Sequence, residues 1–243
     1  MNDKNRQKIY ESYVSDYANF AHGKQNLADI KKQFPVWTAY YGKHLPENKE
    51  AKIFECAAGN GGLLYWLQSL GYKNISGMDV SPEQVQESKQ LGIEGVMQGD
   101  CREWLTTRPN SYDCIIARDL IEHFSKDEVF EFLEMVRNAL RSDGVFIIQT
   151  PSGESLFAAK YRYIDFTHEV IFTHSSLRQV LRAAGFKEEK FYPTGPVVHG
   201  VISLMRFILW KMIVLKLKLY LLIESGSWGG IFTENMIAVA KKK

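Results

Sequence analysis

The feature that most constrains this chain is a regular alternation of short apolar runs and helical stretches between residues 51 and 150. The apolar runs, each of strand length, are residues 51–56, 74–80, 95–98, 112–117 and 145–150. Helix starts are marked between them, since Ser81 precedes Pro82 and Ser125 stands three residues before Glu128 in a capping-box pattern. This alternation predicts a doubly wound α/β fold with a mostly parallel sheet and helices on both faces. Ligands of such sheets bind beyond the carboxyl ends of the strands, so we expect the site just after each run.

The length and composition fit one large globular domain. The 243 residues are 45% hydrophobic and 24% charged, as in an ordinary core-forming chain. The net charge of +2 gives no indication of a nucleic-acid partner. Cys56, Cys101 and Cys114 have no metal-binding spacing, so we expect buried free thiols in a reducing compartment. The N-terminus carries no apolar signal segment, and a cytoplasmic location is therefore expected.

Acidic residues close three successive apolar runs around a glycine-rich turn. The turn, residues 57–62, is rich in small residues that let a ligand approach the backbone closely. It also fits a tight turn or an NAD site, although it lacks the G-x-G-x-x-G spacing of dinucleotide sites. Glu55 suits an ammonium group, Asp79 can accept both hydroxyls of a ribose, and Asp100 can accept the amino group of adenine. Each acid alone could instead cap a helix or lie in solvent.

These residues resemble the class I S-adenosylmethionine (SAM)-dependent methyltransferases, from residue 51 to about residue 192 and again at the strand-like run 235–240. The resemblance implies a Rossmann-like, seven-stranded sheet with an antiparallel last strand, and SAM as the cofactor. It also implies the SAM-binding residues. These are Glu55, Ala57, Gly59 and Gly61 at the methionine end, Asp79 at the ribose with Val80 beside the adenine, and Asp100 and Cys101 at the adenine edge. Ala57 stands where the family has glycine.

The domain organisation follows from this resemblance. We expect a helical cap in residues 1–50, where Leu27, Ile30, Phe34 and Trp37 recur at helical spacing. The SAM-binding domain would be residues 51–243. Within it, we expect a substrate loop at 151–174 and an apolar insertion at 193–230.

The stretch 117–124 resembles the "LEH" segment of small-molecule methyltransferases. The front of that segment lies near the methyl donor in the family, so Arg118 is a candidate for both cofactor binding and catalysis. Arg118 and Asp119 either line the pocket or pair with each other, and the sequence favours neither. Glu122 and His123 are expected to be structural.

The loop 151–174 is long for an α/β connection, and long loops at this edge commonly carry the substrate site. The chain from this loop onward resembles methyltransferases encoded with bacterial surface-polysaccharide genes, which implies a saccharide or related small-molecule acceptor. Candidate substrate-binding residues are Tyr161, Arg162, Tyr163, Glu169 and His199.

A hydroxyl acceptor loses a proton, so a general base is expected. His168 is the first choice, with Asp165 or Glu169 orienting its ring. The alternative is that His168 only closes a hydrogen bond within the loop. His123 and His199 are the next candidates. The histidines show no metal-binding spacing, and no metal is predicted.

The stretch 201–223 is almost wholly apolar but carries Arg206, Lys211, Lys216 and Lys218. These charges argue against a transmembrane helix. Lys211 and Lys218 share a helix face and the other two do not. A helix packed on the domain is the favoured interpretation, with a homodimer surface or a peripheral membrane contact as alternatives. A membrane contact would go with a lipophilic acceptor such as a quinone. The remaining hypothesis is a non-catalytic SAM-binding module.

Overall fold

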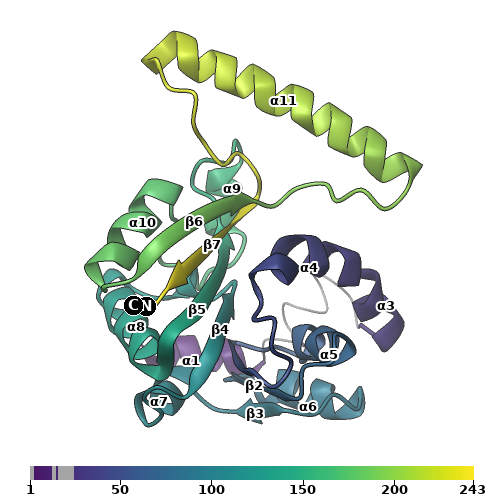
Figure 1. Ribbon diagram of the computed structural model, residues 1–243, viewed down its shortest axis with the longest axis vertical. Coiled ribbons are helices and arrows are strands. Elements are labelled where there is room, and N and C mark those ends of the chain that lie inside the picture. Colours follow the sequence, from purple (N-terminus) through teal and green to yellow (C-terminus); the bar gives the residue numbers. More distant parts are fainter. Residues whose placement is uncertain (1–2, 13–14, 16–24) are drawn as a thin grey trace.

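A computed structural model describes residues 3–12, 15 and 25–243 (Figure 1). Its centre is a seven-stranded sheet with the strand order β3-β2-β1-β4-β5-β7-β6. The first five strands pair in parallel, whereas β7 runs antiparallel to both of its neighbours. The predicted doubly wound sheet with an antiparallel last strand is therefore confirmed. The strands are β1 (Lys52–Cys56), β2 (Asn74–Asp79), β3 (Val96–Gln98), β4 (Tyr112–Arg118), β5 (Leu140–Pro151), β6 (Lys187–Pro193) and β7 (Asn235–Lys241).

Helices cover both faces of the sheet. They are α1 (Asp3–Glu11), α3 (Leu27–Lys32), α4 (Phe34–Tyr41), α5 (Gly62–Ser69), α6 (Pro82–Gln90), α7 (Cys101–Thr106), α8 (Lys126–Ala139), α9 (Ala158–Tyr163), α10 (His174–Ala183) and α11 (Val201–Ser225), with short 3-10 turns η2 (Gly42–His44) and η3 (Ile121–His123). The expected caps are present, because Ser81 accepts from the Gln84 amide and Ser125 and Glu128 form a full capping box. Of the expected N-terminal cap, residues 1–2, 13–14 and 16–24 lie outside the described residues.

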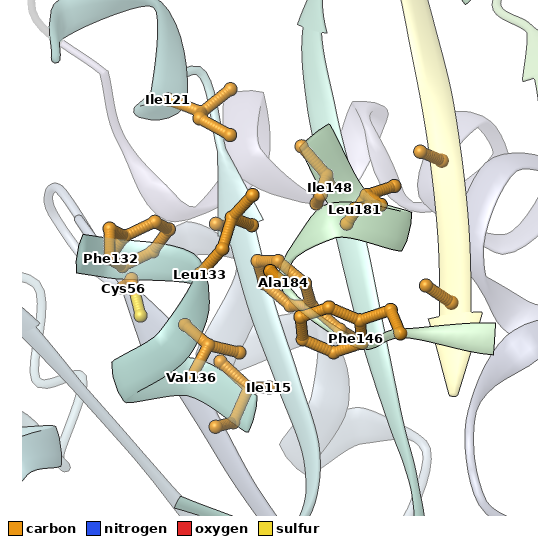
Figure 2. Packing of buried hydrophobic residues seen from close by; sticks show 14 of the residues in the cluster. Cys56, Ile115, Ile121, Phe132, Leu133, Val136, Phe146, Ile148, Leu181 and Ala184 are labelled. Carbon is orange, nitrogen blue, oxygen red and sulfur yellow. The ribbon is translucent and has the colours of Figure 1, made fainter. Parts of the chain in front are cut away.

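Two apolar clusters, one on each side of the sheet, hold the domain together. One cluster joins α8 and α10 to the strands, and α8 contributes Val129, Phe132, Leu133 and Val136 at helical spacing. Figure 2 shows Phe132, Leu133 and Val136 in this cluster. The other joins α4 and α5 to the opposite face through side chains such as Trp37 and Trp66. All three cysteines are buried and free, as expected. This packing fixes the carboxyl ends of β1 to β5 at one edge, where the site is expected.

Several local predictions were incomplete. Helix α7, which begins directly after Asp100, was not predicted. β5 begins before the apolar run 145–150, and its residues 142–144 form an irregularity between the pairs Tyr112–Leu140 and Cys114–Val145. The loop 151–174 contains α9, and Ser152 forms an isolated bridge with Phe172.

The favoured interpretation of residues 201–223 was wrong. They form α11, but the domain leaves most of this helix uncovered, since Ser203 is its only buried residue. Figure 1 shows α11 standing apart from the sheet at the end of two extended connections. Among the described residues, no helix meets the combined length and apolar character of a membrane span.

Candidate active site

A cavity of about 240 Å³ opens at the carboxyl ends of the first four strands. We call it the cofactor cleft. Its lining brings together seven of the residues predicted from the sequence: Ala57, Gly59, Asp79, Val80, Asp100, Cys101 and Arg118. Glu55, which is fully buried at the end of β1, and Gly61, within the turn, are not part of this lining. The lining also contains Arg6 and Tyr10 of α1, Arg102 and His123, which the sequence did not assign to the cleft.

The turn after β1 uses left-handed backbone at alternate residues. Ala57, Gly59 and Gly61 have φ values of 54°, 55° and 79°. Gly61 is required for a second reason, because a Cβ there would meet Ile93 and Val96 at 2.8 Å. Ala57 has no such freedom, and a non-glycine residue in this region is strained. The backbone strain at Ala57 therefore lies in the wall of the cleft, where strained residues are common at functional sites.

Asp79 shapes this turn. Its Oδ2 accepts the Gly59 amide at 2.8 Å, and its Oδ1 accepts the Ser81 amide at 2.9 Å. Burial raises the pKa of Asp79, although these two backbone bonds oppose the rise. A carboxylate fixed in this way at the end of β2 still has lone pairs to accept ribose hydroxyls.

Glu55 is the least satisfied acid of the site. It is fully buried at the end of β1, and neither carboxylate oxygen accepts a hydrogen bond from the described residues. The nearest cation is Arg118, whose Nη2 lies 3.9 Å from Oε1. Burial raises the pKa of Glu55 to about 8 despite that guanidinium. A buried carboxylate with unfilled acceptor capacity fits a site that takes up an ammonium group.

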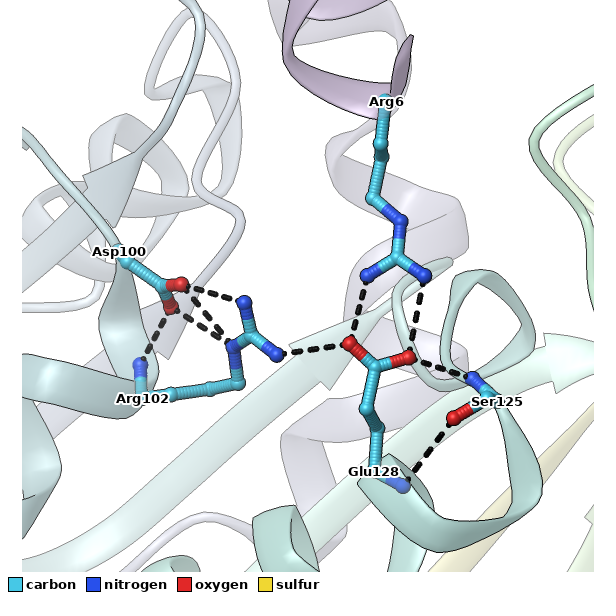
Figure 3. Close-up of polar contacts among 5 residues, drawn as sticks. All are labelled: Arg6, Asp100, Arg102, Ser125 and Glu128. Atoms are coloured by element: carbon cyan, nitrogen blue, oxygen red, sulfur yellow. Dashed lines mark hydrogen bonds and ion pairs between the residues drawn. The ribbon is translucent and has the colours of Figure 1, made fainter. Parts of the chain in front are cut away.

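Asp100 stands in a chain of charges that reaches the N-terminal helix (Figure 3). It caps α7 through the Arg102 amide, and the Arg102 guanidinium binds its carboxylate, with Nη2 2.7 Å from Oδ2. Arg102 Nη1 continues to Glu128 at 2.9 Å. Arg6 then grips both oxygens of Glu128, at 2.7 and 3.0 Å. This chain holds α1 over the part of the cleft that Asp100 and Arg102 line.

Arg118 and Asp119 both line the cleft. Arg118 lies over the ring of Trp37, with 5.5 Å between the guanidinium carbon and the ring centroid. Asp119 has a left-handed φ of 51°, and its two oxygens accept from Gln149 Nε2 at 3.0 and 3.1 Å. Tyr41 in turn donates to the Gln149 side chain. The two polar residues that follow the apolar run of β4 therefore both line the cleft, and Gln149 holds the Asp119 carboxylate in place.

A histidine relay lies beside the cleft. His123 lines the cleft, and its Nδ1 is 2.7 Å from the Thr167 hydroxyl, which donates to Asp165 Oδ1 at 2.6 Å. The hydroxyl hydrogen is used on Asp165, so His123 Nδ1 carries a hydrogen and Nε2 is the free acceptor. Burial, and then the neighbouring His168, lower the pKa of His123 to about 4. His123 is therefore neutral at neutral pH.

His168 is close to His123 but differently held. The ring centroids are 4.7 Å apart, and His168 Nδ1 lies 2.9 Å from the Tyr161 carbonyl. His168 does not line the cleft, and Asp165 bonds its backbone amide rather than its ring. The loop hydrogen bond weighed in the sequence analysis is thus present.

The remaining predicted substrate residues separate into two groups. Arg162 closes its own loop by donating to the carbonyls of His168 and Glu169, and Tyr163 is exposed. Tyr161 and His199 line a second cavity of about 490 Å³ between α4, α9 and the start of α11.

Glu122, His123 and His168 offer ligand atoms within 4.8 Å of one another, the arrangement among the described side chains that most resembles a metal site. Burial raises the pKa of Glu122 well above its usual value, and its carboxyl is hydrogen-bonded to Thr150 at 2.9 Å. A protonated carboxyl is a poor metal ligand. The absence of a metal stays a prediction.

Comparison with known proteins identifies the family. A family model described as a methyltransferase domain matches residues 25–190. The chain belongs to this methyltransferase family. Its members use SAM, and this chain is accordingly a SAM-dependent methyltransferase.

Solved structures share the fold across nearly the whole methyltransferase chain. A SAM-dependent methyltransferase from Thermotoga maritima, described as a possible histamine N-methyltransferase, aligns with a TM-score of 0.65 at 17% identity and covers 97% of this chain and 99% of its own. The phosphoethanolamine N-methyltransferase 2 of Haemonchus contortus, crystallised with SAM, gives 0.62 at 14% identity, covering 96% and 60%.

A curated relative is similar over a shorter stretch. The N-terminal Xaa-Pro-Lys N-methyltransferase 1-A of Xenopus laevis is 30% identical over 104 residues. The match spans 41% of this methyltransferase and 46% of the relative, so about half of the relative's length is matched.

Proposed function

We propose that this methyltransferase transfers the SAM methyl group to a hydroxyl of a saccharide or related polar acceptor, with His123 as the proton acceptor. The observation that carries the proposal is the relay Asp165–Thr167–His123 in the wall of the cofactor cleft. SAM supplies a methyl group already activated on its sulfonium. The tasks left to the protein are to align the acceptor and to remove its proton.

The residues that would hold SAM fit its chemistry. Glu55 offers an unsatisfied carboxylate for the ammonium, Asp79 has acceptor capacity for the ribose, and Asp100 would accept from the adenine. The left-handed turn at Ala57 and Gly59 leaves room for the methionine end. Arg118 lines the cleft with its Nη2 3.9 Å from Glu55 Oε1, and it would orient polar groups there.

The relay explains how a neutral histidine would accept a proton. Thr167 fixes the ring through Nδ1, so Nε2 stays available as the basic nitrogen. Asp165 stabilises the positive charge that the ring would gain, through the Thr167 hydroxyl. His168, the first choice from sequence, has its Nδ1 on a carbonyl and no place in the cleft lining. The structure favours His123 for the base and His168 as its neighbour.

The polar acceptor is supported by the resemblance to polysaccharide-linked methyltransferases and by the residues around the two cavities. Arg118, Asp119 and His123 line the first, and Tyr161, His199 and Glu234 line the second. A lipophilic acceptor such as a quinone and an amine acceptor are the competing substrates.

The test is release of S-adenosylhomocysteine from SAM with nucleotide sugars, glycans, quinones and amines supplied separately. Turnover with amines or quinones alone would refute the saccharide proposal, and SAM binding without any turnover would favour the non-catalytic hypothesis.

Two variants test the base. His123→Ala should lower kcat by about 100-fold or more, the usual contribution of general base catalysis, with SAM affinity nearly unchanged. The matched control is His44→Ala, because His44 lies at the opposite end of the sheet, beside Leu45 and Asp113. A His168→Ala variant that loses more turnover than His123→Ala would return the role to His168.

A further inference from the structure

The apolar surface of α11 is unusual for a helix of a folded domain. Thirteen large apolar side chains between Val201 and Ile223 are exposed, although a contiguous apolar patch is normally covered in a soluble protein. The side chains with lower exposure, such as Phe207, Trp210 and Val214, lie on one side of the helix. Trp210 on this side packs near Gly195 and lines the second cavity. The opposite side of α11 therefore faces away from the domain.

That outward side carries a continuous stripe without charge. Its residues recur at alternating steps of four and three and fall within an arc of about 100° at 3.6 residues per turn. They are Val201, Met205, Ile208, Met212, Leu215, Leu219 and Leu222, and each is 44–76% exposed. We call this set the α11 stripe. Such a stripe matches the requirements of a second helix or of the acyl region of a bilayer.

The charges beside the α11 stripe distinguish these occupants. Lys211 and Lys218 lie along one edge and Lys216 along the other. The only acid of the helix, Glu224, lies away from the stripe, near the direction of Arg206. In a parallel pair of α11 helices, Lys211 of one copy would meet Lys216 of the other. An antiparallel pair would bring the Lys211–Lys218 edge against its own copy. Like charges at these flanking positions oppose pairing.

An anionic lipid surface satisfies the same pattern. Lysine stems can lie along the apolar side chains while their ammonium groups reach the headgroups. Basic residues flanking an apolar helix face are the arrangement of helices that lie in the plane of the membrane interface. We propose that α11 docks this methyltransferase on anionic bilayers, with the α11 stripe in the acyl boundary and Lys211, Lys216 and Lys218 at the headgroups. The docking does not depend on the acceptor or base assigned above.

The test is flotation of the full chain with lipid vesicles. We expect binding to phosphatidylcholine vesicles that contain phosphatidylglycerol, much weaker binding to pure phosphatidylcholine, and loss of binding as salt rises. A triple Lys211→Glu, Lys216→Glu, Lys218→Glu variant should bind at least roughly 100-fold more weakly, since each basic residue contributes about a factor of five near an anionic surface. The matched control changes Lys52, Lys89 and Lys126 to Glu. These lysines are exposed and lie outside α11, and their variant should bind as the parent does.

A second variant tests the apolar contribution. Ile208→Ser combined with Leu215→Ser should also abolish flotation, and the fold should survive because both side chains are half exposed. Circular dichroism verifies folding, and SAM binding provides a second readout. Equal binding to both kinds of vesicle, or an equal loss in the control triple variant, would overturn the charge argument. A chain that stays unbound and sediments as a dimer, which Ile208→Ser/Leu215→Ser converts to monomer, would assign the stripe to a second copy instead.

Discussion

Replacing Glu55 by Gln removes the one acid of the site whose oxygens have no hydrogen bond in the described structure. The pKa of Glu55 is raised from 4.5 to about 8, so the folded protein holds a proton that the unfolded chain releases between these values. Stability of the SAM-free protein should therefore fall as pH rises from about 5 to 8. When the folded state binds one proton more than the unfolded state, the free energy of unfolding falls by about 1.4 kcal/mol for each pH unit of increase. From pH 5.5 to 7.5, Glu55 should lower the free energy of unfolding by about 2 kcal/mol.

The variant Glu55→Gln should lack this decline, because an amide does not titrate. Urea unfolding of parent and variant at pH 5.5 and 7.5 gives the difference directly. SAM binding supplies a second measurement. If the cofactor ammonium takes up the unfilled oxygens, binding at pH 6.5 should release close to one proton from the parent and none from Glu55→Gln. Calorimetry in buffers of different ionisation enthalpy counts these protons.

Two results would refute the reasoning on Glu55. Equal proton release by parent and variant would show that Glu55 keeps its ionisation state when SAM binds. A stability difference that does not change between pH 5.5 and 7.5 would show that Arg118, 3.9 Å away, already keeps Glu55 ionised in the free protein.

Four further predictions follow from the cleft. At saturating SAM, the pH profile of kcat/KM for the acceptor should be flat from about pH 6 to 8 and should fall only towards pH 4, where His123 gains its proton; a bend near 6.5 would indicate an unperturbed histidine. Arg6→Ala should weaken SAM binding about threefold to tenfold, because it frees α1 from Glu128; calorimetry measures this, and unchanged affinity would exclude α1 from the site. In the parent, Arg6 lowers the pKa of Glu128 to about 2, so the stabilisation from Glu128 should be present above pH 4.5 and lost as pH falls towards 2, which acid unfolding checks. Ala57→Gly should relieve left-handed strain and raise the Tm by about 2–4 °C in calorimetric scans, since about 1 kcal/mol is at stake, whereas a lower Tm would contradict the strain. Removing divalent metal with EDTA should leave turnover unchanged, and a loss restored by added metal would assign a cation to Glu122, His123 and His168.

The sheet was predictable because its signals are local. Ser125 and Glu128 mark the start of α8 within four residues, and the apolar face of that helix repeats at a fixed spacing. The acids at the ends of β1 and β2 could likewise be found from the sequence, since parallel strands place their carboxyl ends at one edge. Short α7 was missed although a helix cap was one interpretation of Asp100, because a helix of 6 residues carries too little periodic pattern to be recognised.

The rest of the site depends on contacts between distant residues. Arg6 reaches Glu128 across 122 positions, and no pattern near Arg6 indicates that partner. His123 looked structural because its partners, Thr167 and Asp165, lie on a loop more than forty residues away. The exposure of α11 was equally hidden, because an apolar helix has the same sequence whether a domain, a second chain or a lipid surface covers it.

The charged side chains of the cleft can be compared with the charges that SAM carries. Asp79, Asp100 and Asp119 line it together with Arg6, Arg102 and Arg118, so these six groups cancel. The fully buried Glu55 is then the group whose ionisation decides the net charge. A neutral Glu55 suits the free cleft, where burial opposes charge. SAM carries a sulfonium charge in addition to its ammonium and carboxylate, so an ionised Glu55 suits the bound state. The methylated product leaves behind S-adenosylhomocysteine, which lacks the sulfonium charge. If Glu55 binds the cofactor as proposed, the same carboxylate should hold the methyl donor more strongly than the spent cofactor, which would favour exchange after each turnover.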